Sequence, residues 1–507
     1  MARVERPQTR RPRRRDDATS VAGTELVVDV GAPAHGGHAV ARADGRVIFV
    51  RHALPGERVR VRVTQGRPGD SFWRADAVEV LEASADRVEP PCPLAVPGGC
   101  GGCDLQHVAV TAQREWKATV VTDLLQRVGR LAPDDLPQVV VEALPGAGRG
   151  DNLRWRGRLR FAVAPDGSLG LRSHRGHRVV PIEDCLVATP EVMSTGVTRV
   201  RWPGATEVAV ATGDDATVVA VQRDSAAATV PPVDWARPDG VGLIVTSAVP
   251  PGAPPDDPRP RPPHRAGRSW VSHTVAGVEG SFRVSGAGFW QAHPGAAATY
   301  VGAVRDALAP QRGQTVLDLY SGSGLFAAAL ADDVGNTGRV VSVEGDPSAV
   351  ADARRNLHAR PQVEIIEGDV VAALHALAPP ATTQAAEETE DEQSPLDGAV
   401  LDPPRAGAGH AVVDALCALE PQRVAYVACD PAALARDVAR FAGHGYRLSG
   451  LRAFDAFPMT HHVECVATLT RGPVPTAAAG DTPIGQDGRS DAAADRPAPD
   501  PTIDEGS

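Results

Sequence analysis

The stretch QTVLDLYSGSGLFAAAL, residues 314–330, decides the fold of this chain. An apolar strand pattern around Asp318 runs into a glycine-rich turn, and an alanine-rich helix pattern follows. Gly322 and Gly324 allow the backbone to approach a ligand where a side chain would clash. The start of the helix adds free N–H groups and the positive end of a dipole. The stretch therefore predicts a ligand site at a strand–turn–helix junction.

Two further strand patterns end in acidic residues. The run VVSVEGD places Glu344 at a strand end, where a carboxylate is suited to hydrogen bonding with ribose hydroxyls. The run IIEGDV places Asp369 at a third strand end, where it can contact an adenine amino group. With Asp318 and the glycine turn, these residues predict a nucleotide-type cofactor in a Rossmann-like fold. The alternative is a tight turn beside a charged surface strand.

Composition limits the class of protein. A chain of 507 residues should hold two to four domains, and 42% hydrophobic residues suffice for sizeable cores. The net charge of −11 argues against a uniformly basic coat for nucleic acid. No apolar run approaches the roughly 18 residues of a membrane span, and no signal peptide is visible. We therefore expect a cytoplasmic protein, in which seven cysteines are ligands or catalysts rather than disulfides.

Changes in pattern divide the chain into segments. Arg-rich or Pro-rich ends lack apolar periodicity, short alternating runs with Gly turns favour a β-barrel, and alternating strands and helices favour an α/β domain. The predicted segments are a disordered basic tail (1–20), a small antiparallel β-barrel (21–84), a mixed, mainly β central domain (85–268), an α/β domain (269–472) with an acidic flexible insertion (378–396), and a disordered tail (473–507).

Basic residues in the barrel segment suit RNA phosphates. Arg58, Arg60 and Arg62 alternate along one strand pattern, and we expect His35 and Arg51 to be exposed as well. A merely solvated barrel face is the alternative. Arginine almost replaces lysine in this chain, because Lys117 is its only lysine. We ascribe this bias to a GC-rich genome and give it no mechanistic weight.

Three cysteines cluster in a loop rich in Gly and Pro. Cys92, Cys100 and Cys103 follow the pattern C-x7-C-x2-C, and Cys185 is the only other cysteine before the α/β domain. Four thiolates suit either a tetrahedral zinc ion or an iron–sulfur cluster. Spacing does not separate the two well. Zinc sites usually combine two C-x2-C pairs and this loop has one, which favours a cluster.

An arginine-dense stretch follows in the central domain. Arg154, Arg156, Arg158 and Arg160 alternate with other residues, so a regular strand would present all four on one face. Such a face predicts contact with RNA, and a solvated sheet face is the alternative. Trp155 is suited to stacking on a base, although the core of the strand is its commoner place.

The last third of the chain carries the most specific motifs. In GAVLDPPRAGAG a strand ends at Asp402, and two prolines fix a rigid loop at the edge of the sheet where such folds bind ligands. In RVAYVACDPAALARD, Cys429 precedes a helix whose N-terminus favours a thiolate, while Asp430 opposes it. Glu464 lies in a terminal strand pattern. Gln291, beside two aromatic residues, is suited to the amino-acid part of a cofactor; a helix-start glutamine is the alternative.

Together and in order, these motifs resemble the RNA uracil-5-methyltransferase family. That family uses S-adenosylmethionine and commonly carries an N-terminal TRAM barrel and an iron–sulfur domain. The resemblance covers residues 21–471 and rests on the four-cysteine set, DLYSGSG, DPPRAG, YVACDPAALARD and HHVE. It implies an α/β Rossmann-like methyltransferase domain, preceded by a TRAM/OB-like barrel and a mixed, mainly β central domain.

The resemblance also implies roles for individual residues. Cys429 would be the nucleophile, Glu464 the general base and Asp402 the residue that positions uracil. The cysteine set Cys92, Cys100, Cys103 and Cys185 would hold a [4Fe–4S] cluster, with zinc as the lesser alternative. The cofactor site would be lined by Gln291, Asp318, Tyr320, Ser321, Gly322, Gly324, Glu344, Asp369 and Asp402.

Three departures from the family are visible, one of which is a first cysteine loop that is longer by a couple of residues. Ser321 stands where the family often has cysteine, and Asp430 stands where asparagine is usual, which leaves the environment of the thiolate open. The implied activity is methyl transfer to C5 of a uridine in structured RNA, with 23S-type rRNA favoured over tRNA, by a monomer that contacts no membrane. The alternatives are a methyltransferase with a non-RNA substrate and a non-catalytic RNA-binding protein with a structural cluster.

Overall fold

The computed structural model describes residues 20–146, 152–224, 235–247, 264–378 and 396–472. The predicted tails and the acidic insertion lie outside these ranges, apart from their boundary residues. In the described part of the chain, no helix is both long and apolar enough to cross a membrane.

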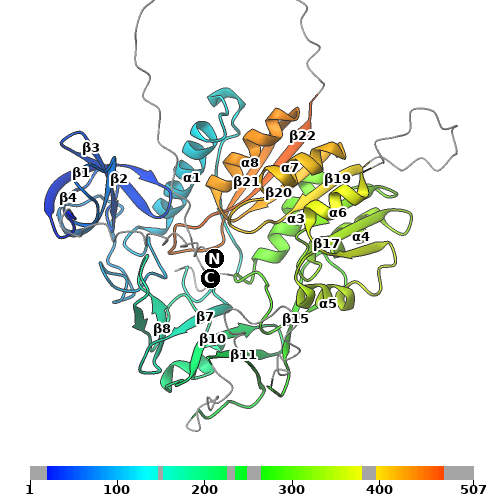
Figure 1. Cartoon of the computed structure of the whole chain (residues 1–507), viewed down its shortest axis with the longest axis horizontal. Helices are drawn as coiled ribbons and strands as arrows, with labels where there is room; N and C mark the ends of the chain where they lie inside the picture. The colour runs from blue at the N-terminus through cyan, green and yellow to red at the C-terminus, as the bar shows by residue number, and fades with distance from the viewer. Residues whose placement is uncertain (1–19, 147–151, 225–234, 248–263, 379–395, 473–507) are drawn as a thin grey trace, which may run out of the picture. The chain divides into compact units, whose positions relative to one another are not determined.

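The predicted barrel is confirmed as a closed sheet of five strands (Figure 1). Its order is β1 (Glu25–Ala34), β2 (His38–Ala43), β3 (Arg46–Arg51), β5 (Phe72–Glu82) and β4 (Arg58–Gln65). One pair departs from the antiparallel expectation, because β3 and β5 run parallel. Along β4, alternation buries Val59 and Val61, while Arg60 and Arg62 face outward and pair with Glu79 and Glu25.

Two basic residues of the barrel segment contact carboxylates, and of these His35 is exposed, as expected, while Arg51 is not. Arg51 is 6% exposed, and its guanidinium donates to Oδ1 of Asp104 at 3.1 Å. His35 lies 3.1 Å from Oδ2 of Asp430. The prediction of an exposed Arg51 is therefore wrong, because its guanidinium is buried in an ion pair with Asp104 of the cysteine loop.

The central segment contains helix α1 (Val110–Arg127) and forms a sheet of seven strands. Its core includes Trp155, Phe161 and Trp202, all fully buried. The strands, in sheet order, are β13 (His264–Ala266), β12 (Val241–Ser247), β11 (Thr217–Arg223), β10 (Ala205–Thr212), β7 (Arg158–Val163), β8 (Leu169–Arg172) and β9 (Val179–Pro181). Short helices are α2 (Pro190–Ser194), η2 (Pro133–Asp135) and η3 (Val197–Arg199).

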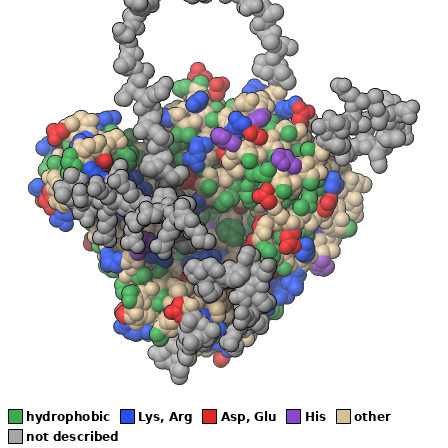
Figure 2. All heavy atoms as spheres, viewed as in Figure 1, with side chains coloured by type: hydrophobic (Ala, Val, Ile, Leu, Met, Phe, Trp, Pro, Cys, Tyr) green, Lys and Arg blue, Asp and Glu red, His purple; other side chains and the backbone are tan. Residues whose placement is uncertain are grey.

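The predicted face of four arginines is wrong. β7 begins only at Arg158, and Arg154 has a positive φ of 57°, so a regular alternation does not extend over the stretch. Arg154 donates to both carboxylate oxygens of Asp184, and Arg158 donates to the carbonyl of Ser285. Of the four, Arg160 is the exposed one. On the visible part of the face in Figure 2, basic and acidic side chains intermingle.

The predicted Rossmann-like domain is confirmed as an eight-stranded sheet with helices on both faces (Figure 1). The strands, in sheet order, are β18 (Val363–Glu367), β17 (Arg339–Glu344), β16 (Thr315–Leu319), β19 (Leu396–Leu401), β20 (Arg423–Ala428), β22 (Glu464–Arg471), β21 (Tyr446–Asp455) and β6 (Val141–Ala143). Strands β18 to β20 are parallel, and β22 is antiparallel to both of its neighbours. A separate pair, β14 (Trp270–Thr274) and β15 (Ser281–Ser285), lies outside this sheet.

Both faces of the sheet are buried, which explains its continuous apolar strand patterns. Neighbouring residues of β16 point to different cores: Val316 packs with the first helix layer and Leu317 with the second. The first layer is α3 (Ala296–Leu308), α4 (Leu325–Val334) and α5 (Pro347–Asn356); the second is α6 (Val370–Leu377), α7 (Gly409–Ala418), α8 (Pro431–Gly443) and α1.

One strand of the methyltransferase-type sheet comes from far upstream. β6 pairs in parallel with β21, with Val141 opposite Ala453. Helix α1 lies beside α8 on the same sheet (Figure 1). The sheet is therefore built partly from residues that precede position 269.

Candidate active site

The glycine turn predicted as a cofactor site follows β16 at the carboxyl edge of the sheet. Tyr320, Gly322 and Gly324 all have positive φ angles, of 62°, 54° and 89°. At Gly324 an added Cβ would lie 2.8 Å from Cδ1 of Leu357, so this position needs glycine both for its backbone and for its close neighbour. The hydroxyls of Ser321 and Ser342 hydrogen-bond at 2.7 Å and tie the turn to β17.

Two carboxylates brace this turn. Oδ2 of Asp318 accepts a hydrogen bond from the backbone of Ala327 at 2.7 Å, while its Oδ1 is buried without a partner among the described residues. Burial raises the pKa of Asp318 well above its ordinary value. Glu344 accepts from the backbone N–H of Gly322 at 2.8 Å and of Asp346 at 2.7 Å. An unsatisfied buried oxygen beside a glycine turn fits a polar cofactor.

Gln291 and Asp369 are less closely tied to this turn. Asp369 is exposed and caps α6 by accepting from the backbone of Ala372 at 3.0 Å. Gln291 is half-buried and precedes the first residue of α3, Ala296, so it is not a helix-start glutamine. Hydrogen bonds among the described residues link Gly322 and Glu344 directly, but do not reach Gln291 or Asp369.

The proposed nucleophile and base lie at the ends of neighbouring strands. Ala428, the last residue of β20, pairs with Cys465 of β22. Continuing this antiparallel register by one residue brings Cys429 opposite Glu464. Burial, together with the charges of Glu464 and Asp402 and against that of Arg405, raises the pKa of the Cys429 thiol to about 12. In the free protein Cys429 is therefore a thiol.

Asp402 and Glu464 form a carboxyl pair, in which Glu464 is buried and Asp402 is half-buried. Asp402 follows β19, and its backbone N–H donates to the carbonyl of Leu319 at 3.3 Å. Burial raises the pKa of Asp402, and burial together with the charge of Asp402 raises the pKa of Glu464. Arg405 partly offsets this for Glu464. One group of such a pair holds a proton readily, which suits proton transfer at a bound substrate.

Asp430 has a structural task. Its Oδ1 accepts from the backbone N–H of Ala433 at 2.8 Å, which caps α8, and its Oδ2 lies 3.1 Å from Nε2 of His35. Although burial alone would raise the pKa of Asp430, the hydrogen bond and charge of His35 bring it below the ordinary value. His35, which follows β1 of the barrel, therefore contacts Asp430, the residue next to Cys429.

The four clustered cysteines line one pocket, with an empty volume of about 430 Å³ that includes open solvent. Cys92, Cys100, Cys103 and Cys185 surround it together with Arg156. The backbone N–H of Gly102 donates to Sγ of Cys100 at 3.4 Å. Within the described ranges, no three Cys, His, Asp or Glu side chains are placed to hold a single metal ion.

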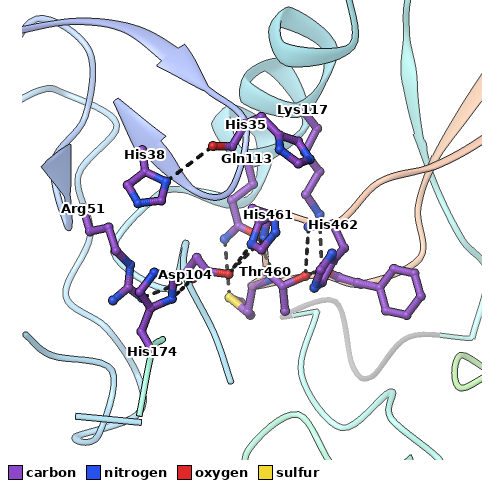
Figure 3. Close-up of polar contacts among 12 residues, drawn as sticks. His35, His38, Arg51, Asp104, Gln113, Lys117, His174, Thr460, His461 and His462 are labelled. Atoms are coloured by element: carbon purple, nitrogen blue, oxygen red, sulfur yellow. Dashed lines mark hydrogen bonds and ion pairs between the residues drawn. The ribbon is translucent and has the colours of Figure 1, made fainter. Parts of the chain in front are cut away.

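Sequence reasoning missed several polar residues near the site. The carboxylate of Asp104 hydrogen-bonds to His461 (Figure 3). The ammonium of Lys117 donates to Asp455 and to the carbonyl of Phe457. Lys117 carried one usable signal, because it is the only lysine in a chain that otherwise uses arginine. Asp104 and His461 carried none beyond their place next to predicted site residues.

Family models agree with this domain arrangement. A model described as tRNA (Uracil-5-)-methyltransferase matches residues 271–472, and a TRAM domain model matches residues 20–76. Among solved structures, the chain is similar to a Pyrococcus abyssi tRNA (uracil-54, C5)-methyltransferase in complex with S-adenosyl-L-homocysteine. The TM-score is 0.60 at 21% identity, and the match covers 87% of this chain and 99% of that one. At this identity the likeness concerns the fold.

Curated relatives match over nearly their whole length. The chain is 45% identical to an uncharacterized RNA methyltransferase of Streptomyces avermitilis, over 88% of this chain and 98% of that protein. It is 33% identical to the 23S rRNA (uracil(1939)-C(5))-methyltransferase RlmD of Chromohalobacter salexigens, over 90% of this chain and 91% of that protein. With the barrel, the Rossmann-like sheet and the ordered motifs, these matches show that the chain belongs to the S-adenosylmethionine-dependent RNA uracil-5-methyltransferase family.

Proposed function

We propose that this enzyme methylates C5 of a uridine in 23S-type ribosomal RNA through a covalent adduct between Cys429 and C6 of the base. The observation that carries the proposal is the register of β20 and β22, which continues to Cys429 opposite Glu464. A thiol and a carboxyl group at adjacent strand ends supply the two groups that this chemistry needs.

The proposed reaction follows from the weak nucleophilicity of uracil C5. Sγ of Cys429 bonds to C6, which makes C5 enolate-like. The methyl donor, S-adenosylmethionine, supplies a methyl group to C5. Glu464 then takes the proton from C5, the C6–S bond breaks, and the electron pair returns to sulfur. Asp402 holds the ring edge of uracil against Cys429.

Protonation states set two requirements on this sequence. Because the pKa of Cys429 is raised to about 12 in the free protein, its proton has to pass to water as C6 is attacked. Arg405 is the neighbouring group that favours the thiolate. Glu464 must be ionised when it accepts the C5 proton, although its pKa is raised by burial.

The choice of ribosomal RNA rests on relatives. Two proteins with 33% and 32% identity are named 23S rRNA (uracil(1939)-C(5))-methyltransferase RlmD, from Chromohalobacter salexigens and Aromatoleum aromaticum. The tRNA enzyme of known structure is 21% identical. Transfer of labelled methyl to 23S rRNA but not to tRNA transcripts would support this choice, and the reverse result would contradict it.

We also propose that Cys92, Cys100, Cys103 and Cys185 hold a [4Fe–4S] cluster. Their common pocket and the N–H of Gly102 on a cysteine sulfur support it, because clusters are held by thiolates and tuned by such hydrogen bonds.

The test of the methyl-transfer mechanism is Cys429→Ala. We expect it to reduce methyl transfer to RNA by roughly a thousandfold or more, because the loss of one residue from a group that acts as a unit abolishes most of the rate enhancement. Cys417→Ala is the matched control, since Cys417 is a buried cysteine of α7. Wild-type turnover in Cys429→Ala would refute the covalent mechanism.

A further inference from the structure

The loop that precedes Glu464 is held by segments that lie far upstream in the sequence. Residues 456–463 connect β21 to β22, and Glu464 is the first residue of β22. We call these residues the 456–463 loop. Three polar residues from the cysteine loop and from α1 bind it: Asp104, Gln113 and Lys117 (Figure 3). We call these three the anchor residues.

Lys117 fixes the start of the loop. Its Nζ lies 2.5 Å from Oδ1 of Asp455 and 3.1 Å from the carbonyl of Phe457. The side chains of Lys117 and Asp455 are 0% and 2% exposed. Breaking a buried ion pair leaves an uncompensated charge in the interior, so this contact holds both segments firmly. Lysine, with a compact ammonium, can occupy this enclosed place where the planar guanidinium of arginine is larger.

Gln113 fixes the middle of the loop at Met459. The amide of Gln113 accepts from the backbone N–H of Met459 at 2.9 Å and donates to the carbonyl of Val108 at 2.9 Å. The carbonyl of Met459 accepts from the backbone N–H groups of Asp104 and Leu105, at 3.1 and 3.0 Å. Both backbone groups of Met459 are therefore bonded to segments far away in the sequence.

Met459 also carries backbone strain. Its φ is 68°, in the left-handed region that residues with side chains seldom adopt. Such a conformation persists only where the surroundings determine it, and it is commonest at functional sites. The hydrogen bonds to both backbone groups of Met459 hold it in this conformation.

Asp104 fixes the end of the loop. Its Oδ2 accepts from the ring N–H of His461 at 2.6 Å, and its Oδ1 accepts from Arg51 of the barrel at 3.1 Å. The neighbouring residue His462 lies 3.4 Å from Nη2 of Arg405, in the DPPR motif. These contacts lead from the barrel through the loop to the residues around the carboxyl pair.

We propose that the anchor residues position Glu464, by holding the 456–463 loop in the one conformation that presents this carboxylate to C5 of the bound uracil. They are positioning residues, because they act through the loop and do not touch the reacting atoms. The inference rests on the proposed role of Glu464 as the base that takes the C5 proton. It assigns to the cysteine-loop segment and α1 a task in one step of the reaction.

The proposal predicts a defect in one step only. Adduct formation depends on Cys429, while adduct resolution depends on Glu464, so a loosened loop should slow resolution and spare formation. A misplacement of about 1 Å costs on the order of a hundredfold in rate. We therefore expect Gln113→Leu and His461→Ala to slow decay of the denaturant-resistant protein–RNA adduct by roughly ten- to a hundredfold. The rate of adduct formation should change by less than about threefold.

The experiment is a single-turnover assay with the full-length protein, substrate RNA and S-adenosylmethionine, in which the adduct is followed on denaturing gels. His461→Ala is the second variant because this ring is partly exposed, so the protein should fold even if Gln113→Leu does not. His461→Asn should restore much of the decay rate, since its amide can donate to Asp104. His444→Ala is the matched control, because His444 makes a surface contact of 2.8 Å with Asp414 away from the loop.

Glu464→Gln, run in parallel, tests the role of Glu464 as the base separately from the role of the anchor residues. If Glu464→Gln accumulates adduct but Gln113→Leu and His461→Ala decay at the wild-type rate, the anchor proposal is overturned and the base assignment stands. An equal slowing of formation and decay in the loop variants also overturns it, since that is the signature of general destabilisation. If Glu464→Gln accumulates no adduct, the base assignment fails and the anchor proposal fails with it.

Discussion

Ala428 at the end of β20 pairs with Cys465 of β22, and one further step along this register leads to Cys429 and Glu464. Two residues that are far apart in the sequence thus become neighbours through an antiparallel ladder. The pairing depends on β22 being inserted between β20 and β21, which reverses the direction of an otherwise parallel sheet.

Replacing the proposed base should trap the reaction halfway. In Glu464→Gln the amide cannot accept the C5 proton, so the methylated adduct should persist after its formation. We expect a protein–RNA complex that survives denaturation and retains labelled methyl, together with a loss of turnover of about a hundredfold or more. The measurement is gel electrophoresis of the complex. Cys429→Ala should form no such complex, and complex formation in that variant would show that another residue is attached.

Asp402→Asn should weaken the pH dependence of stability. Burial raises the pKa of Asp402 from its ordinary value of 3.8 to about 7, so the native state holds this proton more tightly than the unfolded state. The resulting stabilisation is complete below pH 3.8 and is lost as the pH rises through about 7. Asparagine does not titrate, so the variant should lack this loss.

The measurement is urea unfolding of both proteins at about pH 4.5 and about pH 7.5. The free energy of unfolding of the wild type should fall more between these values than that of Asp402→Asn. Identical pH dependence in the two proteins would contradict a raised pKa at this position.

The cysteine pocket should hold iron. Protein purified without oxygen should be brown, with about four iron atoms per chain. Cys185→Ser should lower the iron content, because Cys185 is the proposed ligand from outside the loop, whereas Cys417→Ser in α7 should leave it unchanged. Colourless wild-type protein with stoichiometric zinc would overturn the assignment.

Gly324→Ala should destabilise the cofactor turn. A side chain there must adopt a φ of 89°, which costs about 1–2 kcal/mol, and its Cβ would crowd Leu357. Gly443→Ala, at the exposed end of α8 where the added Cβ meets nothing, should stay within about 0.5 kcal/mol of the wild type. Urea unfolding gives the stability, and calorimetry gives the affinity for S-adenosylmethionine. Equal effects of the two substitutions would contradict the strain at Gly324.

Local patterns predicted the fold well where one physical cause acts over a short stretch. Alternating Val and Arg in β4 produced the barrel strand, and the apolar run around Leu317 produced a strand buried on both faces. The same logic failed at residues 154–160, because Asp184 and Ser285 draw arginines away from a regular alternation. A pattern of residue types contains no information about partners that lie distant in the sequence.

Charges inside the molecule were the hardest feature to predict. No role was assigned to Lys117 from the sequence, yet its ammonium is buried against Asp455. Arg51 was expected on the surface and instead pairs with Asp104. Asp430 was expected to act on Cys429 and also caps α8 and binds His35. Each of these pairs joins separate segments, so only the folded chain defines it.

The parallel contact between β6 and β21 has a consequence for how this enzyme is made. Glu142 and Arg452, 310 residues apart in the sequence, are held together by two hydrogen bonds at this edge of the sheet. During synthesis β6 leaves the ribosome long before its partner exists, so this edge of the sheet can close only after nearly the whole described chain has been made. A fragment that starts at residue 269 would leave β21 as an open edge, ready to pair with another chain and aggregate.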